Sequence, residues 1–272
     1  MRADVRGKSA LVSSITSSIT SGSITLKTAA KGEYQMGIYK IDSFTDRVKG
    51  NSYVGRGIVT GQTPSGKAAS AYFIMGRSPN SRNRLFAIHD KEVYTEPFDE
   101  SKVEDPSLII YAAIRSFENF LIVTNGDQTD TIYEGLARGL AFPETLESRQ
   151  FEPDAPNLTP RISSITDLQT GNYEMSILKS ADAEGTACNR FTFSYEALPG
   201  LGHFIHTYVE DGSPLPTFQG EPERVAVPDD IDAFAQEIWE ALDEDNKISL
   251  YVRYTDLPEG TYEERLINRY EK

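Results

Sequence analysis

The sequence predicts an α+β fold with mostly antiparallel sheets. From about residue 38 onward, short stretches rich in Val, Ile and Tyr are separated by turn residues, and amphipathic helical patterns are few. Because these helices do not alternate regularly with the strands, a doubly wound parallel sheet is not supported. The chain has 272 residues, which suits one large domain or two small ones and allows a substantial core.

The expected strands are apolar runs or period-two patterns bounded by turns. They lie at 53–61, 69–75, 85–88, 93–95, 108–114, 120–124, 161–166, 172–179, 190–195, 203–209 and 248–254. The first two should form a hairpin across the turn at 64–66, and the last should be half-buried. Helices are expected from a cap at Thr129 or Asp130 to Phe142-Pro143, from Pro228-Asp229-Asp230 onward, and at 261–269.

Residues 1–35 differ from the rest and read as a low-complexity basic leader that is not expected to belong to the fold. A degenerate Ser/Thr repeat runs from Ser13 to Thr25, and basic residues outnumber acidic ones in this segment. Three explanations stay open: an upstream extension ahead of a true start at Met36, which we favour, a transit peptide, or a native β-hairpin arm. Residues 36–272 are expected to form a single domain because no linker divides them.

Charge and cysteine content restrict the partners and the compartment. A net charge of −14 argues against a general nucleic-acid binder, since phosphate would be repelled without a strong basic face. No apolar run reaches ~18 residues, so no membrane-spanning helix is expected. The single cysteine, Cys188, cannot form an internal disulfide, which fits a reducing, cytoplasmic compartment.

The most distinctive segment is 76–84, which holds three arginines and no acid in an acidic chain. Arginine presents a planar fork that pairs with phosphate oxygens two at a time. Serine and asparagine side chains between the arginines add neutral donors. The segment therefore predicts a grip on the phosphate of a small nucleotide-like substrate, and the alternative is a solvated basic turn.

Two further segments combine polar side chains at corners of the chain. Residues 124–130 follow a strand and precede a helix, where free backbone N–H groups favour ligand sites. Residues 151–162 bring two carboxylates and an arginine onto a proline-rich loop, where paired acids can shift each other's pKa. The alternatives are an ordinary capped turn and a plain structured loop. The three histidines, His89, His203 and His206, make a poor metal set, so no metal site is expected.

Taken in order, these elements resemble the archaeal-type IMP cyclohydrolase family. The matching pieces are YVGRG at 53–57, FIMGRSPNSRNR at 73–84, DPSLIIYAAIR at 105–115, IVTNGDQTD at 122–130 and NLTPRI at 157–162. The resemblance covers about residues 36–165, with weaker support to the C-terminus. It implies a four-layer αββα sandwich similar to the N-terminal nucleophile hydrolases. It does not imply self-processing here, because Gly37 follows Met36 and is no nucleophile.

The resemblance also implies an activity in purine biosynthesis. The family converts 5-formamidoimidazole-4-carboxamide ribonucleotide to IMP and water, and no metal or organic cofactor is implied. The residues implied as catalytic are Arg77, Tyr111 and Glu152, with Tyr111 moving a proton if a nearby arginine lowers its pKa. The residues implied to bind substrate are Arg56, Arg82, Arg84, Asn125, Asp127, Thr159 and Arg161.

Two other functions stay open. One is a non-catalytic purine-nucleotide-binding relative that keeps the phosphate grip, and the other is an amidohydrolase acting on a different phosphorylated amide. The chain is longer than the archaeal pattern, which leaves room for a changed substrate. The expected partner is a small-molecule nucleotide, with neither nucleic acid nor membrane, and a homo-oligomer stays open.

Overall fold

The computed structural model of the chain describes residues 37, 39–103 and 110–271. Its contacts group Ile41–Lys272 into one compact unit. The predicted leader at 1–35 and the first two residues of the predicted strand at 108–114 lie outside the described residues. Within the described part, no helix is long and apolar enough to cross a membrane.

Two antiparallel sheets form the unit. One contains β1 (Arg56–Gln62), β2 (Ala68–Met75), β10 (Leu201–His206), β11 (Glu223–Ala226), β12 (Lys247–Thr255) and β13 (Tyr262–Asn268). Its order is β11-β10-β1-β2-β12-β13. The other contains β3 (Leu85–His89), β4 (Glu92–Glu96), β5 (Tyr111–Phe117), β6 (Phe120–Thr124), β7 (Arg161–Asp167), β8 (Tyr173–Ser180) and β9 (Cys188–Tyr195), paired in sequence order.

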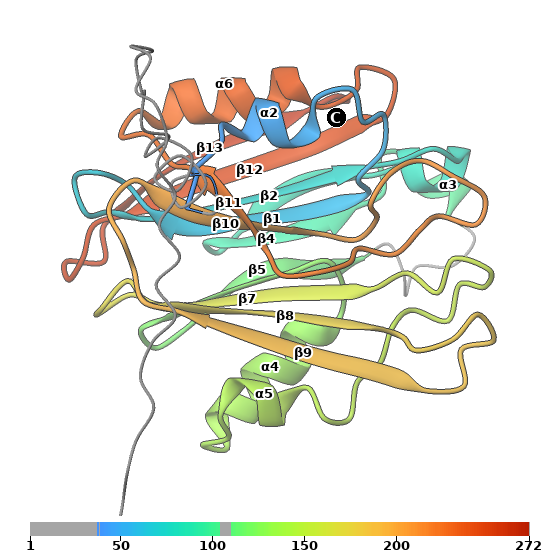
Figure 1. Cartoon of the computed structure of the whole chain (residues 1–272), viewed down its shortest axis with the longest axis horizontal. Coiled ribbons are helices and arrows are strands. Elements are labelled where there is room, and N and C mark those ends of the chain that lie inside the picture. Colours follow the sequence, from blue (N-terminus) through green and yellow to red (C-terminus); the bar gives the residue numbers. More distant parts are fainter. Residues whose placement is uncertain (1–36, 38, 104–109, 272) are drawn as a thin grey trace, which may run out of the picture. The chain divides into compact units, whose positions relative to one another are not determined.

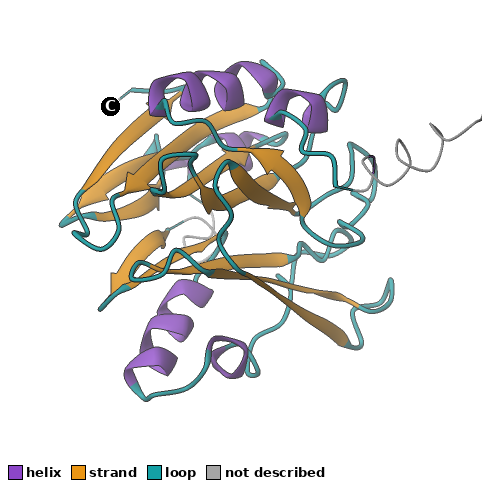
Figure 2. Ribbon diagram, turned by 60° about the vertical axis from the view of Figure 1, so that its left-hand side comes forward, coloured by secondary structure: helices purple, strands orange, loops and turns teal. Residues whose placement is uncertain are grey.

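Helices cover the outer face of each sheet. Figure 1 shows α2 (Phe44–Val48) and α6 (Ile231–Ala241) above the first sheet, and α4 (Gln128–Ala137) and α5 (Phe142–Thr145) below the second. The short α3 (Pro79–Arg82) and the 3-10 turn η1 (Glu100–Lys102) lie in connections. The order is therefore helix, sheet, sheet, helix, which Figure 2 shows from a second direction. The predicted α+β class with mostly antiparallel sheets is confirmed.

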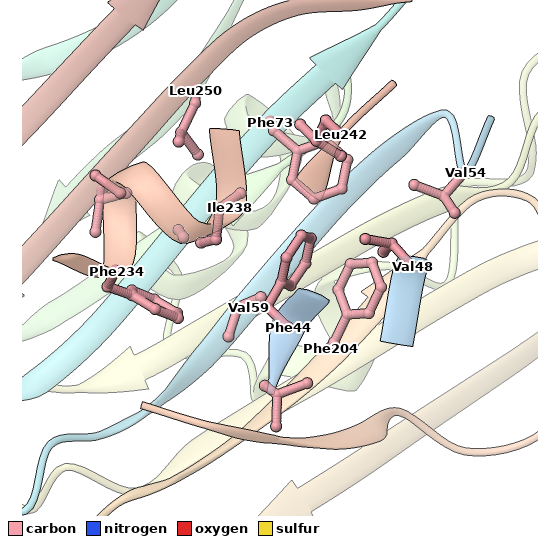
Figure 3. Close-up of a cluster of buried hydrophobic side chains, with 14 of the residues drawn as sticks. Phe44, Val48, Val54, Val59, Phe73, Phe204, Phe234, Ile238, Leu242 and Leu250 are labelled. Carbon is pink, nitrogen blue, oxygen red and sulfur yellow. The ribbon is translucent and has the colours of Figure 1, made fainter. Parts of the chain in front are cut away.

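Three apolar clusters hold these layers together. Under α2 and α6, Phe44, Phe204, Phe234 and Ile238 interdigitate above the first sheet (Figure 3). A second cluster fills the space between the sheets, and a third lies between the second sheet and the helices α4 and α5. The spacing of Ile231, Phe234 and Ile238 is the helical period that predicted α6, and Asp230 caps that helix by accepting the N–H groups of residues 232 and 233.

Three local predictions are wrong. The segment expected as a last helix at 261–269 is β13, because it pairs along its length with β12. The strand expected to be half-buried, at 248–254, is buried at every position, because it lies between β2 and β13 with apolar clusters on both faces. The helix expected to start at Thr129 or Asp130 starts at Gln128, and Phe142-Pro143 opens α5 instead of only closing α4.

Candidate functional site

A cavity of about 260 Å³ lies where β1 begins and β2 ends. Its walls come from four segments far apart in the sequence: the start of β1, the connection from β2 to β3, the loop before β7 and the loop after β10. The lining residues are Tyr53, Arg56, Arg77, Ser78, Asn80, Ser81, Arg84, Glu152, Asp154, Asn157, Thr159, Tyr208 and Leu215. Of the three sequence segments singled out for binding, 76–84 and 151–162 line this cavity, whereas 124–130 contributes no lining residue.

Arg56 is held at the wall of the cavity by a sharp entry into β1. Gly55 has φ +79°, and a Cβ there would meet the hydroxyl of Thr207 at 2.1 Å, so only glycine fits. The turn lets the backbone N–H of Arg56 donate to the Thr207 hydroxyl at 3.1 Å. The Arg56 side chain is 7% exposed. Burial is the largest single influence and opposes its charge, but the Glu152 carboxylate and three nearby tyrosines together outweigh it and raise the pKa of Arg56.

Arg84 is the second buried cation of the cavity. It directly precedes β3 and is 5% exposed. Burial and the like charge of Arg56 lower its pKa, although Tyr111 and Glu152 act in the opposite direction. Within the described residues, the Nε atoms of both arginines are buried without a hydrogen-bond partner. Two buried guanidinium groups that repel each other and keep unused donors form a site suited to an anion.

The buried end of the cavity is lined by one carboxylate, and two phenols that are not lining residues interact with its arginines. Glu152 is 5% exposed, and burial raises its pKa although Arg56 and Arg161 lower it. The hydroxyls of Tyr111 and Tyr72 lie 2.9 Å apart. Burial raises the pKa of Tyr111, and this effect exceeds the opposing influence of Arg84 and Arg56. The two arginines act in the expected direction, but burial outweighs them, so the pKa of Tyr111 is not lowered and Tyr111 keeps its proton at neutral pH.

Arg77 lies at the mouth of the cavity and is partly exposed. Its guanidinium forms an ion pair with Asp211, donates to the Gly212 carbonyl at 3.0 Å and lies 5.0 Å from the centre of the Tyr53 ring. Beside it, Ser78 and Ser81 cap each other across the single turn of α3. The mouth of the cavity thus combines one partly exposed cation, Arg77, with neutral hydrogen-bond donors. The buried end holds the buried charges of Arg56, Arg84 and Glu152.

The loop before β7 forms the third wall through a chain of hydrogen bonds. Asp154 accepts from the backbone N–H of Thr159 at 2.7 Å and lies 2.5 Å from its hydroxyl. That hydroxyl is also 2.5 Å from the hydroxyl of Tyr208. The backbone N–H of Glu152 donates to the Thr159 carbonyl at 2.8 Å, which fixes Glu152 relative to this chain.

Five of the residues expected at the site line the cavity: Arg56, Arg77, Arg84, Glu152 and Thr159. Tyr111 adjoins them through its interactions with Arg56, Arg84 and Glu152, and Arg161 adjoins Glu152.

The other three expected residues point elsewhere. Arg82 donates to the Gly76 carbonyl at 3.0 Å and to Asn246 at 3.1 Å. The Asn125 side chain joins the strand ends by donating to the Pro160 carbonyl and accepting from Ile162. Asp127 pairs with Arg149 and Arg161 at 2.5 and 2.6 Å. The contacts of Asn125 and Asp127 fix the corner after β6 to the start of β7.

Sequence reasoning missed Tyr53, Tyr72, Tyr208 and Leu215. The first two carried a signal, since Tyr53 opens the YVGRG piece and Tyr72 lies in the returning strand of its hairpin. Tyr208 and Leu215 come from the second half of the chain, and nothing local in the sequence links them to the arginines. Among the described residues, no group of three or more His, Cys, Asp or Glu side chains is arranged to hold a metal ion.

The fold and the cavity together define an α+β protein with a cavity of small-molecule size built around two buried arginines. A family model described as IMP cyclohydrolase-like protein matches residues 53–260, and the chain belongs to this family. The family resemblance indicated by the sequence motifs is thereby confirmed.

Curated relatives extend this comparison. An IMP cyclohydrolase of Methanopyrus kandleri is 34% identical over 145 residues, which are 49% of this chain and 72% of that protein. IMP cyclohydrolases of Methanocaldococcus jannaschii and Methanocella arvoryzae are 34% and 31% identical over 118 and 117 residues, in both cases 42% of this chain and 57% of the relative. These two matches cover less than two thirds of the relatives' own length.

Proposed function

We propose that this chain is an IMP cyclohydrolase that closes the pyrimidine ring of 5-formamidoimidazole-4-carboxamide ribonucleotide to give IMP and water. The observation that carries the proposal is the buried pair Arg56 and Arg84, which face one cavity together with Glu152. The curated relatives with this named activity support the same reaction.

The reaction asks three things of the protein. The carboxamide nitrogen attacks the formyl carbon of the same molecule, so the reacting atoms are already tethered and the site must select a reactive conformer. A proton must leave the attacking nitrogen as the N–C bond forms, while the formyl oxygen gains negative charge and then a proton. In the second stage this oxygen leaves as water, and the former formamido nitrogen loses its proton as the C=N bond forms.

We assign the reacting end of the substrate to the buried end of the cavity. Glu152 is the base for the carboxamide proton, and its raised pKa brings it closer to the pH at which proton transfer in both directions is efficient. Arg84 and the protonated Tyr111 stabilise the developing oxyanion, for which one well-placed donor contributes ~2.7–4 kcal/mol. Arg56 keeps Glu152 ionised between turnovers by its positive charge.

We assign the phosphate to the mouth, where Arg77 and the neutral donors of Ser78 and Ser81 gather. This division reverses the roles that the sequence indicates for Arg77 and Arg84, because burial suits a fixed oxyanion site and exposure suits a phosphate that enters from water. Arg82 takes a structural role through its bonds to Gly76 and Asn246.

The test is a spectrophotometric assay of IMP formation from the formamido ribonucleotide, with purified chain and no added metal. Substrate-dependent appearance of IMP supports the proposal, and Arg84→Gln should abolish it. Thermal stabilisation by IMP without turnover would instead indicate a non-catalytic nucleotide binder. Release of ammonia or formate from other phosphorylated amides, without ring closure, would indicate an amidohydrolase.

The proposal also includes a relationship between this fold and a known class of hydrolases. We infer that the helix–sheet–sheet–helix order is related to that of the N-terminal nucleophile hydrolases, and superposition on structures of that class tests this relation strand by strand. A cytoplasmic location and a homo-oligomer stay predictions, which fractionation and size-exclusion chromatography with light scattering would check.

A further inference from the structure

A second cavity, of about 460 Å³, lies at the other end of β2 and β12 from the candidate active site. Near the first cavity Lys247 pairs with Met75, whereas Arg253 pairs with Ser70 close to the start of β2. The second cavity is lined by turns of both sheets and by Arg253: residues 90–92, 116, 118–119, 168–169, 258, 260 and 262. It shares no lining residue with the first.

Arg253 is a buried cation on the wall of this cavity. It is 4% exposed, its Nε donates to the Thr255 hydroxyl at 3.1 Å, and its guanidinium carbon lies 3.7 Å from the centre of the Tyr262 ring. Its cross-strand partner Glu264 accepts the Tyr251 hydroxyl at 2.6 Å instead of forming an ion pair with it. Within the described residues, no carboxylate lies within ion-pair distance of Arg253.

A buried guanidinium without a paired carboxylate is unfavourable, because burial removes its hydration. The pKa of Arg253 is accordingly lowered, since burial outweighs the favourable influence of Tyr251, Tyr262 and Glu264. Aromatic stacking and two neutral hydroxyls, those of Thr255 and Tyr251, satisfy only part of its hydrogen-bonding capacity, which comprises five N–H donors in a fixed fork. A bound carboxylate would use two of the remaining donors side by side.

The rim of the cavity decides which anion fits. Asp90 and Glu118 are exposed at the rim beside one exposed cation, Lys91, while Glu92 is already paired with Arg115 at 2.9 Å. Two exposed acids against one lysine leave the rim net negative, which disfavours a multiply charged anion such as a phosphate dianion or a nucleotide. A single carboxylate with a neutral body meets less repulsion, and Leu168 and Pro258 offer apolar surface for that body.

We propose that this cavity is a second ligand site, which binds a small metabolite carrying a single carboxylate on Arg253. The site is separate from the ring-closing reaction and stands independently of the proposed function.

The test is ligand-observed saturation-transfer NMR with benzoate as the probe. Benzamide is the matched neutral control, and inorganic phosphate is the multiply charged competitor. We expect saturable benzoate binding that benzamide does not reproduce and phosphate does not displace. Arg253→Gln should weaken it at least tenfold, and Arg84→Gln, which removes the buried arginine of the other cavity, should leave it unchanged.

Because Arg253→Gln replaces a buried side chain and could impair folding, a second variant tests the same cavity from an exposed position. Ser116→Phe starts from an exposed position on β5 and fills the cavity while keeping Arg253, so it too should abolish benzoate binding. The proposal is overturned if benzoate binds wild type, Arg253→Gln and Ser116→Phe equally, if benzamide binds as well as benzoate, or if Arg84→Gln is the variant that loses binding. IMP formation is measured on the same samples, so a failed second site and a failed ring closure give different results.

Discussion

Replacing Arg84 by methionine should make the protein more stable and nearly inactive. Arg84 and Arg56 are 5% and 7% exposed, and Glu152 is the carboxylate that their charges share. Replacing a whole buried ion pair or triad by apolar side chains of similar volume ranges from neutral to a stabilisation of about 1–4 kcal/mol, whereas removing one partner of a matched pair is destabilising. Since Glu152 can neutralise only one of the two arginines, we expect a stabilisation of about 1–2 kcal/mol. In a chain of this size that raises Tm by roughly 2–8 °C.

The effect on turnover should have the opposite sign. Loss of an oxyanion donor costs about 2.7–4 kcal/mol of transition-state stabilisation, so kcat should fall roughly 10²–10³-fold. Arg82→Met is the matched control, because Arg82 lies two residues away but bonds to Gly76 and Asn246 outside the cavity. That variant should lose about 1–3 kcal/mol of stability through its two hydrogen bonds and keep turnover close to wild type.

Differential scanning fluorimetry and the IMP assay, run on the same preparations, measure both effects. An Arg84→Met protein that melts well below wild type would show that the buried arginine pair is held together by attractions that outweigh its repulsion. Equal turnover losses in the two variants would refute the separation of a reacting centre at Arg84 from a structural role at Arg82.

Three further predictions concern the same cavity. Tyr111→Phe should lower kcat roughly 10²–10³-fold and destabilise the fold by about 1–3 kcal/mol, because the Tyr72 hydroxyl loses its partner; unchanged kcat would remove Tyr111 from the reaction. If Glu152 acts as the ionised base, kcat/KM must fall as pH drops through its raised pKa, so the acid limb should have its midpoint above the ordinary value of 4.5 and vanish in Glu152→Gln. Asp211→Asn should lower KM up to about fivefold, because the exposed ion pair that occupies Arg77 contributes ~0.2–1 kcal/mol; a raised KM would show instead that Asp211 orders the mouth.

Short-range patterns of apolar residues, with the period of a strand or of a helix, were enough to predict most of the secondary structure. The apolar runs of β1 and β2, the tight turn between them and the apolar face of α6 depend on residues close in sequence, so they can be predicted without knowing their partners. The segment that became β13 could not be read in this way. Its glutamates, arginine and leucine favour helix, and only pairing with the buried β12 makes it a strand.

The candidate site was predicted in composition more than in arrangement. Arg56, Arg84 and Glu152 were expected from three separate segments and do line one cavity. Asn125 was expected to touch the substrate, but its amide is used up between the Pro160 carbonyl and Ile162. A polar side chain at a strand end serves equally well as a ligand or as a brace, and the choice depends on which backbone groups are left unpaired nearby.

In the arginine-rich segment at 76–84, the role of each arginine depends on where the backbone places its side chain, which the charge pattern alone does not predict. Ser78 and Ser81 cap one turn of α3, and that turn carries the chain around between Arg77 and Arg84. As a result, Arg77 remains at the mouth while Arg84 enters the core beside Arg56. A fold gains nothing from burying two like charges beside each other, and folding alone would favour an apolar residue at one of the two positions. The pair therefore supports the proposed anion site, because the oxyanion of the proposed intermediate would relieve the repulsion between the two guanidinium groups.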